Sequence, residues 1–296
     1  MTTAERQHRL AYLYAAIAVV FWSTSASVFK LSLRHVGVLT LLFFASLTST
    51  VAFFLYAAAT GKLAHLRGFT RRDYLRSAGL GFLNPFLYYA VLFEAYSLLP
   101  AQEAQPINFV WPLTLVLLSI PLLHQRIKAA SIVAIFISFC GVVVIGTHGD
   151  IFSFRFSNPA GIALALSTTV VWSLFWIYNA RDKQDETLRM LVNFAFGTVF
   201  VLAAALCLGK LEVPPLKGLV GSVYVGLFEM GITFLAWLKA LKSAKTTAHV
   251  VNLIYLVPFL SLVVIAAVLG EKILPSTFIG LLLIIAGIVL QKIWDR

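Results

Sequence analysis

Long apolar stretches separated by short charged segments dominate the pattern of this chain. Nine stretches of at least 17 residues contain no Asp, Glu, Lys or Arg, and a tenth, residues 218–238, is interrupted only by Glu229. A helix that crosses a bilayer needs about 20 mostly apolar residues. The pattern therefore predicts an all-α membrane protein with ten transmembrane helices. The uninterrupted stretches are residues 10–29, 35–61, 77–93, 104–125, 129–149, 156–180, 190–209, 246–270 and 273–291.

The composition excludes the other broad classes of protein. Hydrophobic residues make up 60% of the chain and charged residues 12%, whereas soluble domains have about 45–50% and about 25%. The two cysteines, Cys140 and Cys207, both fall inside apolar stretches, so we expect packing residues and no disulfide framework. The sequence contains no metal-ligand cluster, phosphate-binding glycine loop or dinucleotide motif. It therefore predicts neither a metal nor a cofactor.

The distribution of the basic residues predicts the orientation in the membrane. With ten spans, the two termini and the even-numbered loops share one side, which holds 17 of the 23 Lys and Arg residues, against 6 on the other side. All the loops are short, so the excess of positive charge places both termini in the cytoplasm. The net charge of +11 is thus a topological signal that favours contact with the lipid bilayer and no binding of nucleic acid.

The chain also contains an internal repeat, residues 1–150 and residues 156–296, with five predicted spans in each half. Since five is odd, the second half is expected to lie inverted relative to the first. Inverted repeats with a substrate site near the midplane are typical of secondary transporters that work by alternating access. The matching positions are residues 21–23 with 171–173, 81–84 with 226–229, Pro112 with Pro258, 125–127 with 271–273, and Gly141 with Gly287.

These matches resemble the drug/metabolite transporter superfamily in its ten-helix EamA-type branch. Each half has Trp-Ser in its first helix and a proline-bearing fourth helix that leads into a charged turn. That turn is Gly-Glu-Arg or Gly-Glu-Lys in the family; residues 270–272 conform and residues 124–126 depart from it. The aromatic content and the stretch from Asn108 to Pro112 are most similar to YddG-type exporters of aromatic and other amino acids.

The resemblance implies a secondary exporter of small molecules in the bacterial inner (plasma) membrane. It leaves open whether the chain works as a monomer or as a homodimer.

Polar residues inside the predicted third and eighth spans are candidate site residues, because polar groups in hydrocarbon are costly and usually face a cavity or a partner helix. Glu229 is the one acid deep within a span. It is either a carboxylate that binds a proton or an ammonium group, or a protonated side chain bonded to a neighbouring helix. Its repeat partner, Asn84, precedes Pro85, which predicts a kink. Tyr88 follows one helical turn after Asn84, so we expect both side chains on one face.

The fourth and ninth spans each carry a polar and aromatic stripe just before the paired prolines. Gln105, Asn108 and Trp111 form the first stripe. The second consists of His249, Asn252 and Tyr255. Amides bind carboxylate and ammonium groups, and aromatic rings hold apolar bodies or cations. The stripes therefore predict a cavity for an amphipathic metabolite, although amides also join helices by hydrogen bonds.

The tryptophans are expected to play different roles. Trp22, Trp172 and Trp176 belong to the repeat or lie one turn from it, and they either line a pathway or form part of a membrane-interface belt. Trp237 lies beside Lys239 at a predicted cytoplasmic end, which favours an interface anchor. His249 is either a proton carrier or a satisfied hydrogen-bonding group.

The resemblance implies a transporter that exports amino acids, aromatic and other neutral ones, and these residues predict a central cavity between the repeats. An exporter of other small metabolites or cationic drugs is the alternative, and an intramembrane enzyme is disfavoured because no catalytic groups converge. Proline residues at kinks or gates are expected at Pro85, Pro112 and Pro258. The predicted substrate-binding residues are Trp22, Asn84, Tyr88, Asn108, Trp111, Trp172, Trp176, Glu229, His249, Asn252 and Tyr255.

Overall fold

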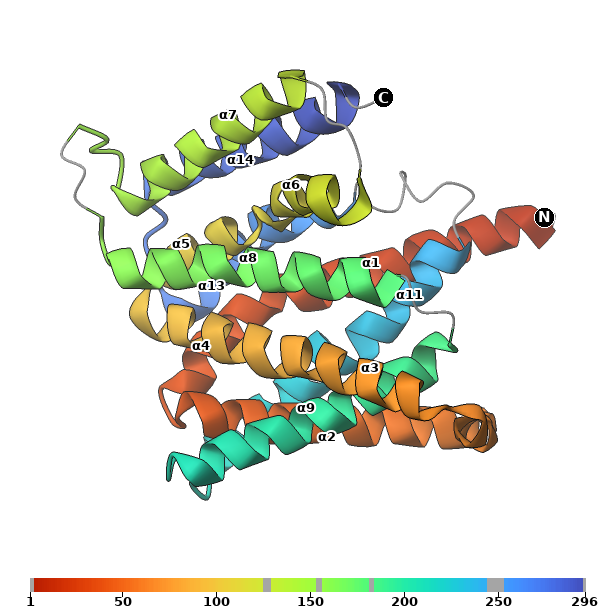
Figure 1. The fold of residues 1–296 in the computed structure, drawn as a ribbon. Coiled ribbons are helices and arrows are strands. Elements are labelled where there is room, and N and C mark those ends of the chain that lie inside the picture. The colour runs from red at the N-terminus through yellow and green to blue at the C-terminus, as the bar shows by residue number, and fades with distance from the viewer. Residues whose placement is uncertain (1–2, 125–128, 153–155, 181–183, 244–252, 295–296) are drawn as a thin grey trace. The chain divides into compact units, whose positions relative to one another are not determined.

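A computed structural model describes residues 3–124, 129–152, 156–180, 184–243 and 253–294. These residues form helices and connecting loops, and no strand occurs among them (Figure 1). The helices are α1 (Thr3–Leu33), α2 (Val38–Ala59), η1 (Lys62–Gly68), α3 (Arg71–Gly81), η2 (Phe82–Leu87), α4 (Tyr88–Leu98), α5 (Ala101–Asn108), α6 (Trp111–Leu123), α7 (Ala129–Gly146), α8 (Pro159–Ala180), α9 (Glu186–Cys207), α10 (Leu216–Tyr224), η3 (Val225–Gly231), α11 (Ile232–Ser243), η4 (Ile254–Leu256), α13 (Val257–Leu269) and α14 (Pro275–Trp294).

Six helical segments in the described part are long and apolar enough to cross a membrane. Three of the other predicted spans correspond to shorter apolar helices, and the stretch 77–93 is divided among α3, η2 and α4. The all-helical prediction therefore holds for the described residues, and the count of ten spans remains a prediction. The six segments are Arg9–Leu33, Val38–Ala59, Ala101–Leu122, Pro159–Asn179, Glu186–Cys207 and Leu216–Ala240.

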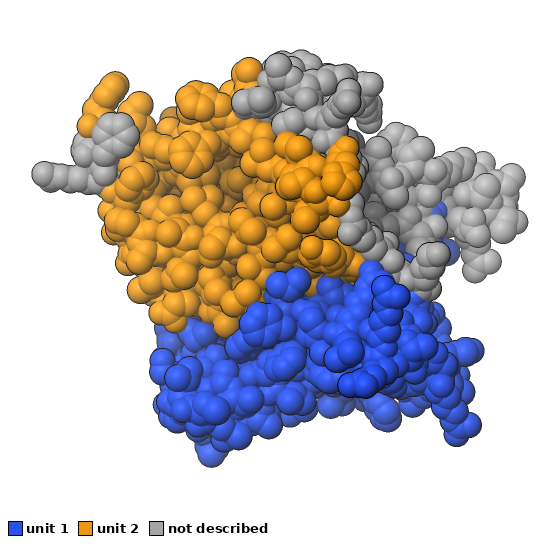
Figure 2. Space-filling view, viewed as in Figure 1, with its two compact units in different colours: residues 1–86, 183–264 blue, residues 87–182, 265–296 orange. Residues whose placement is uncertain are grey.

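The chain divides into two compact units, each of which draws on both sequence halves (Figure 2). Unit 1 contains residues 1–86 and 183–264, and unit 2 contains residues 87–182 and 265–296. The packing units are thus a different division of the chain from the sequence repeat. Each unit is described separately below.

In unit 1, helices from the two sequence halves pack against one another. α1 packs along α11, and α2 packs along both α9 and η3. α3 packs on α9 through two glycines, because a Cβ on Gly81 would collide with the carbonyl oxygen of Asn193 and one on Gly197 with the ring of Pro85. Small residues allow helix backbones to approach closely. The α3–α9 crossing is therefore a backbone-to-backbone contact.

In unit 2, α4, α5 and α6 pack on α8, while α7 and α14 form a pair that lies side by side (Figure 1). Three glycines set the spacing of this pair. A Cβ on Gly141 would lie 2.5 Å from the carbonyl oxygen of Gly280, and one on Gly287 would collide with Ser138. The hydroxyl of Ser138 donates to the carbonyl of Ile284 on the facing helix at 3.0 Å. The pair therefore depends on the absence of side chains at the contact.

The serine of each Trp-Ser pair makes an equivalent contact with the other sequence half. Ser23 Oγ donates to the carbonyl oxygen of Val257 at 3.4 Å in unit 1, and Ser173 Oγ donates to that of Trp111 at 3.2 Å in unit 2. Val257 and Trp111 are the residues that precede the paired prolines, Pro258 and Pro112. The two motifs that recur in the sequence are therefore in contact, and each contact joins one half of the sequence to the other.

One end of unit 1 is fixed by charged side chains at helix starts. Asp185 caps α9, since its carboxylate accepts from the backbone N–H groups of Thr187 and Leu188 at 2.9 and 3.3 Å. It also pairs with Lys62 Nζ at 2.7 Å. Partial burial would raise the pKa of Asp185, but the hydrogen bonds from Lys62, Leu188 and Thr187 outweigh it and lower the pKa below its ordinary value of 3.8.

Replacement of Gly280 by Ala should weaken the α7–α14 pair. The added Cβ would lie 2.5 Å from Ile145 Cγ1 and 2.6 Å from the Gly141 carbonyl oxygen, and overpacking of this kind costs about 1–3 kcal/mol. Thermal unfolding in detergent should show a lower midpoint. Gly79→Ala is the control: no heavy atom lies within 4 Å of its added Cβ, and such a change stabilises a helix by about 0.4–1 kcal/mol. Equal midpoints for the two variants would contradict this account.

The ion pair between Asp185 and Lys62 should make the stability of the folded state decrease in acid. Because the pKa of Asp185 is lower in the folded chain, its contribution to stability is present above the ordinary value of 3.8 and is lost as the pH falls through the folded value. Asp185→Asn should therefore lower the thermal midpoint at pH 7 and have a smaller effect below about pH 3. The carboxylate is 35% exposed, so solvent screening keeps the effect small, below about 1 kcal/mol. A variant whose deficit is the same at every pH would argue against this ionic contribution.

Candidate functional site

The predicted site residues that the structure describes are divided between the two units. Unit 1 holds Trp22, Asn84 and Glu229, and unit 2 holds Tyr88, Asn108, Trp111, Trp172 and Trp176. His249 and Asn252 lie outside the described residues. Tyr255 belongs to the short helix η4, and Pro258 is buried at the start of α13.

Glu229 is a buried acid in the interior of unit 1, with 7% of its surface exposed. Ser25 Oγ donates to Glu229 Oε2 at 2.5 Å, so α1 supplies a hydrogen bond to the carboxyl group. Aromatic rings follow the same stretch of helix: Phe228 stacks on Phe21 and on Tyr224, with ring centroids 4.7 and 4.8 Å apart. A buried carboxyl group in a helix segment that also carries aromatic residues has the chemistry to bind a proton or an organic ammonium group.

Both mid-span polar residues lie in π-helical turns. Asn84 is in η2 and Glu229 is in η3, and the two positions correspond in the sequence repeat. In η3, the carbonyl of Gly226 accepts from Ser49 Oγ at 2.7 Å, and that of Phe228 accepts from Thr233. π-Helical turns inside longer helices are frequent at functional sites. The structure therefore distinguishes these two segments from the regular helices around them.

The backbone at Asn84 departs from helical geometry, with φ −149° and ψ 121°. The reason is Pro85, whose ring disfavours the α conformation in the preceding residue. The expectation that Asn84 and Tyr88 share one helix face was therefore wrong, because helical spacing does not apply across this break. Asn84 is fully buried.

Trp22 packs among aromatic side chains of α11. Its ring lies 5.6 Å from that of Trp237 and 6.4 Å from that of Phe234, measured between centroids. Trp237 is only 7% exposed, which contradicts the expectation of an interface anchor. The sequence misled here because adjacency to Lys239 signals a helix end, whereas the helical turn places the indole on the packed side of α11. The nitrogen of Lys239 instead lies over the rings of Tyr14 and Tyr56, 5.5 and 5.1 Å from their centroids.

In unit 2, four of the predicted residues form a connected polar and aromatic cluster. Tyr88 Oη donates to Asn108 Oδ1 at 3.4 Å, and Asn108 Nδ2 donates to Thr168 Oγ1 at 2.7 Å. The ring of Tyr88 lies 4.6 Å from that of Trp172, with 35° between the planes. Trp172 in turn contacts Trp176 at 5.7 Å. An amide held beside tyrosine and indole rings can recognise a molecule with one polar end and one aromatic end.

The predicted stripe of the fourth span crosses a break between two helices. α5 ends at Asn108 and α6 begins at Trp111. Gln105 Oε1 accepts from Tyr96 Oη at 2.6 Å, and Trp111 contributes its carbonyl to Ser173. Asn108 is thus the member of the stripe whose side chain reaches the cluster of Tyr88 and Trp172. Thr168, its partner on α8, is a residue that the sequence did not single out, because a lone threonine in an apolar span gives no signal.

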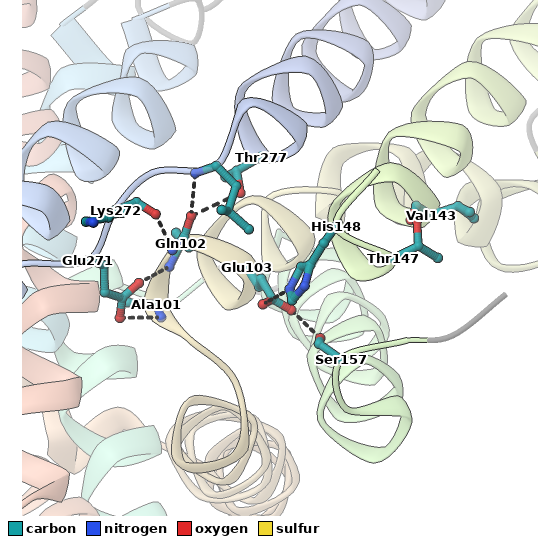
Figure 3. A network of polar contacts seen from close by, with 11 residues as sticks. Ala101, Gln102, Glu103, Val143, Thr147, His148, Ser157, Glu271, Lys272 and Thr277 are labelled. Carbon is teal, nitrogen blue, oxygen red and sulfur yellow. Dashed lines mark hydrogen bonds and ion pairs between the residues drawn. The ribbon is translucent and has the colours of Figure 1, made fainter. Parts of the chain in front are cut away.

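The N-terminus of α5 is held by a network of polar contacts (Figure 3). The two carboxylate oxygens of Glu271 accept from the backbone N–H groups of Ala101 and Gln102, both at 3.1 Å. Gln102 in turn donates to the carbonyl of Lys272 at 3.0 Å and accepts from the N–H of Leu274 at 3.0 Å. A carboxylate at a helix start satisfies free N–H groups and interacts favourably with the helix dipole. The Gly-Glu-Lys turn therefore caps the helix that carries Asn108.

A second branch of the same network surrounds Glu103, a carboxylate with 1% of its surface exposed. His148 Nε2 lies 2.8 Å from Oε1, and Ser157 Oγ donates to Oε2 at 2.5 Å. These contacts fasten α5 to the loop that joins α7 and α8 (Figure 3). The sequence could not assign this role to Glu103, because its partners lie 45 and 54 residues away.

Across the described stretches, no group of three or more His, Cys, Asp or Glu side chains is arranged to hold a metal ion. The predicted site residues in the two units offer hydrogen-bonding groups, a single carboxyl group and aromatic rings. This chemistry suits the binding of an organic molecule.

Comparison with known proteins identifies the relatives of the chain. The sequence profile of the EamA-like transporter family matches residues 9–147 and again residues 159–291. A crystal structure with 24% sequence identity superposes with a TM-score of 0.64 over 97% of each chain, which supports the fold.

Three curated relatives are also similar in sequence. An aromatic amino acid exporter YddG from Ancylobacter novellus is 28% identical over 77% of this chain and 78% of its own length. A probable terminal-alkyne amino-acid exporter from Streptantibioticus cattleyicolor is 29% identical, over 93% and 90%. An uncharacterized transporter from Clostridium kluyveri is 27% identical, and this match spans 57% of the chain and little more than half, 56%, of that protein.

Glu271→Ala should loosen α5. The variant leaves the N–H groups of Ala101 and Gln102 without their carboxylate acceptor, and loss of a helix cap costs about 0.5–2 kcal/mol. Hydrogen exchange measured by mass spectrometry should become faster in peptides that cover residues 101–108. Glu94→Ala, at an exposed position of α4, is the control and should leave exchange in α5 unchanged. If Glu271→Ala and Gln102→Ala act on one network, the double variant should show less than the sum of the two effects.

Proposed function

The chain belongs to the EamA-like transporter family and is a multi-pass membrane transporter, not an enzyme; from that premise we propose that it exports amino acids. The proposed substrates are neutral amino acids, those with aromatic side chains among them. The chain has no ATP-hydrolysing motif, so the driving force is a gradient of the substrate or of an ion. Members of this family that are named for their cargo include exporters of amino acids, which supports the proposal.

The proposed architecture is ten spans in two inverted repeats, with both termini in the cytoplasm and the protein in the plasma membrane. Several features support it: the 17-to-6 distribution of basic residues, the two successive matches to the family profile, and the π-helical turns at corresponding positions. The equivalent contacts of Ser23 and Ser173 also support a duplicated architecture. Such repeats exchange conformations to open a central cavity to either side in turn.

The observation that carries the proposal is the cluster of Tyr88, Asn108 and Trp172 in unit 2. Its amide is fixed by hydrogen bonds from Tyr88 and to Thr168, and its indole ring offers an apolar face. Preorganised polar groups in an apolar site give orientation and specificity to a small ligand. We assign Asn108 to the polar end of the substrate, and Tyr88, Trp172 and Trp176 to its apolar side chain.

Glu229 is the basis of a second candidate function, the export of cationic drugs or other small cations. Its buried carboxyl group suits an ammonium ligand, and no Lys or Arg lies deep in a predicted span to bind an anionic nucleotide conjugate. An amino acid also carries an ammonium group, so Glu229 is compatible with both functions. It is also the candidate for coupling transport to protons.

Counterflow in proteoliposomes tests the proposal. Proteoliposomes loaded with unlabelled L-tryptophan or L-leucine should accumulate the radiolabelled amino acid. Proteoliposomes loaded with hydrophobic cations in place of the amino acid should not. Asn108→Ala removes the amide and leaves Thr168 without its donor, so the transport specificity constant should fall about 10- to 100-fold, which corresponds to about 1.4–2.8 kcal/mol.

Ser167→Ala is the matched control, because this neighbour of Thr168 on α8 is exposed and bonds only within its own helix. Its transport should equal that of the wild type. A chain that exchanges hydrophobic cations but none of a panel of amino acids has the second function. Comparison with and without a pH gradient, in the wild type and in Glu229→Gln, separates facilitated from proton-coupled transport.

A further inference from the structure

Two fully buried amides in unit 1 make no hydrogen bond within the part of the chain that the structure describes. Both side-chain polar atoms of Asn84, and both of Asn193, are without a partner. Each residue has 0% of its surface exposed. Buried amides nearly always find partners, and an unpaired one costs free energy. Two such residues in one unit therefore point to a ligand that supplies the missing partners.

The two residues belong to the same helix crossing. Gly81, three residues before Asn84, contacts the backbone of Asn193, and Gly197 contacts Pro85, the residue after Asn84. Asn193 and Gly197 are one turn apart on α9 and share its face toward this crossing. The glycines bring the π-helical turn η2 directly against α9. Asn193 is thus a residue of the same site as Asn84, although nothing in the sequence pattern singled it out.

The start of α9 near this crossing carries charged residues of both signs, among them Asp185, Glu186 and the buried Arg189. Arg189 lies one turn before Asn193 on α9 and is only 5% exposed. It also stands in the first turn of α9, where the helix dipole is positive. The carboxylate of Asp185 already caps this helix and pairs with Lys62. A ligand group that accepts hydrogen bonds matches the N–H donors of Asn193, one turn away from Arg189.

We propose that Asn193 and Asn84 bind the α-carboxylate and α-ammonium head group of an amino acid. This inference rests on the proposed function and adds, within unit 1, a second position at which the head group of the substrate is bound, separate from the position assigned to Asn108 in unit 2. Two amides offer four N–H donors and two carbonyl acceptors. The donors of Asn193 match the carboxylate, with Arg189 one turn away, and the carbonyl of Asn84 matches the ammonium group. A simple amine has no acceptor for the amide donors. The site therefore distinguishes an amino acid from the amine that has the same side chain and lacks the carboxylate.

A functional origin of the unpaired amides predicts opposite effects on stability and on binding. Asn193→Leu replaces the amide by an apolar group of similar size, so the substrate-free protein should unfold at the same or a higher temperature. Its affinity for L-tryptophan and L-leucine should nevertheless fall at least tenfold. Affinity for tryptamine and 3-methylbutylamine, which lack the carboxylate, should change less than twofold. Isothermal titration in detergent measures the affinities for the amino acids and for the amines, and thermal unfolding measures the stability.

Asn193→Asp is the second variant, and it keeps the shape of the side chain. The added negative charge should weaken the binding of both amino acids and leave the binding of both amines unchanged or stronger. Asn179→Leu is the matched control. Asn179 is 1% exposed, and its Oδ1 atom has no hydrogen-bond partner in the described chain, but it lies on α8 in unit 2. Its replacement should not alter the affinity for amino acids.

The results separate this inference from the function on which it rests. Wild-type protein that binds L-tryptophan or L-leucine, together with Asn193→Leu and Asn193→Asp variants of equal affinity, would overturn the role of Asn193 and leave amino-acid export standing. An equal loss for amino acids and for their amines would also overturn the head-group assignment. Wild-type protein that binds no amino acid in titration or counterflow would overturn both.

Discussion

The cost of an unpaired polar group in an apolar interior governs where this chain places its hydroxyl, amide and acid side chains. Most hydroxyls in the helices satisfy this requirement locally; Ser222, for example, donates to the carbonyl of Gly218 one turn earlier. A smaller set reaches another helix, as Ser25 does to Glu229 and Asn108 does to Thr168. Local pairing is sufficient for a stable helix. The longer contacts therefore identify the groups whose position relative to other helices matters, and these groups form the candidate site.

The same constraint explains why the helices break where they do. Pro85 removes a backbone donor and excludes the α conformation from Asn84, and the chain responds with a π-helical turn. At the start of α5, the free N–H groups are paired with Glu271 from a distant part of the sequence. Each interruption places a side chain in a position that a regular helix does not offer. Asn84 and Asn108 both owe their surroundings to such an interruption.

The sequence was informative wherever a feature depends on composition or on local spacing, and uninformative where it depends on distant partners. The helical content, the family and the grouping of Asn108 with Tyr88 and Trp172 followed from apolar stretches and from the repeat. The shared face of Asn84 and Tyr88 did not, because a uniform helical period fails at a proline. The capping role of Glu271 lay beyond prediction because its partners are about 170 residues away. The buried position of Trp237 depends on packing with Trp22, which no local pattern encodes.

The two sequence halves share their geometry but differ in the chemistry placed on it. Ser23 and Ser173 make corresponding contacts with the residues before the paired prolines, and both halves form a π-helical turn at the same position. At that position one half has a neutral amide, Asn84, and the other has an acid, Glu229. A transporter with two identical halves would present the same group to its substrate from both sides. Asn84 and Glu229 instead give the two π-helical turns different chemistry, since an amide donates and accepts hydrogen bonds and a carboxyl group can carry charge.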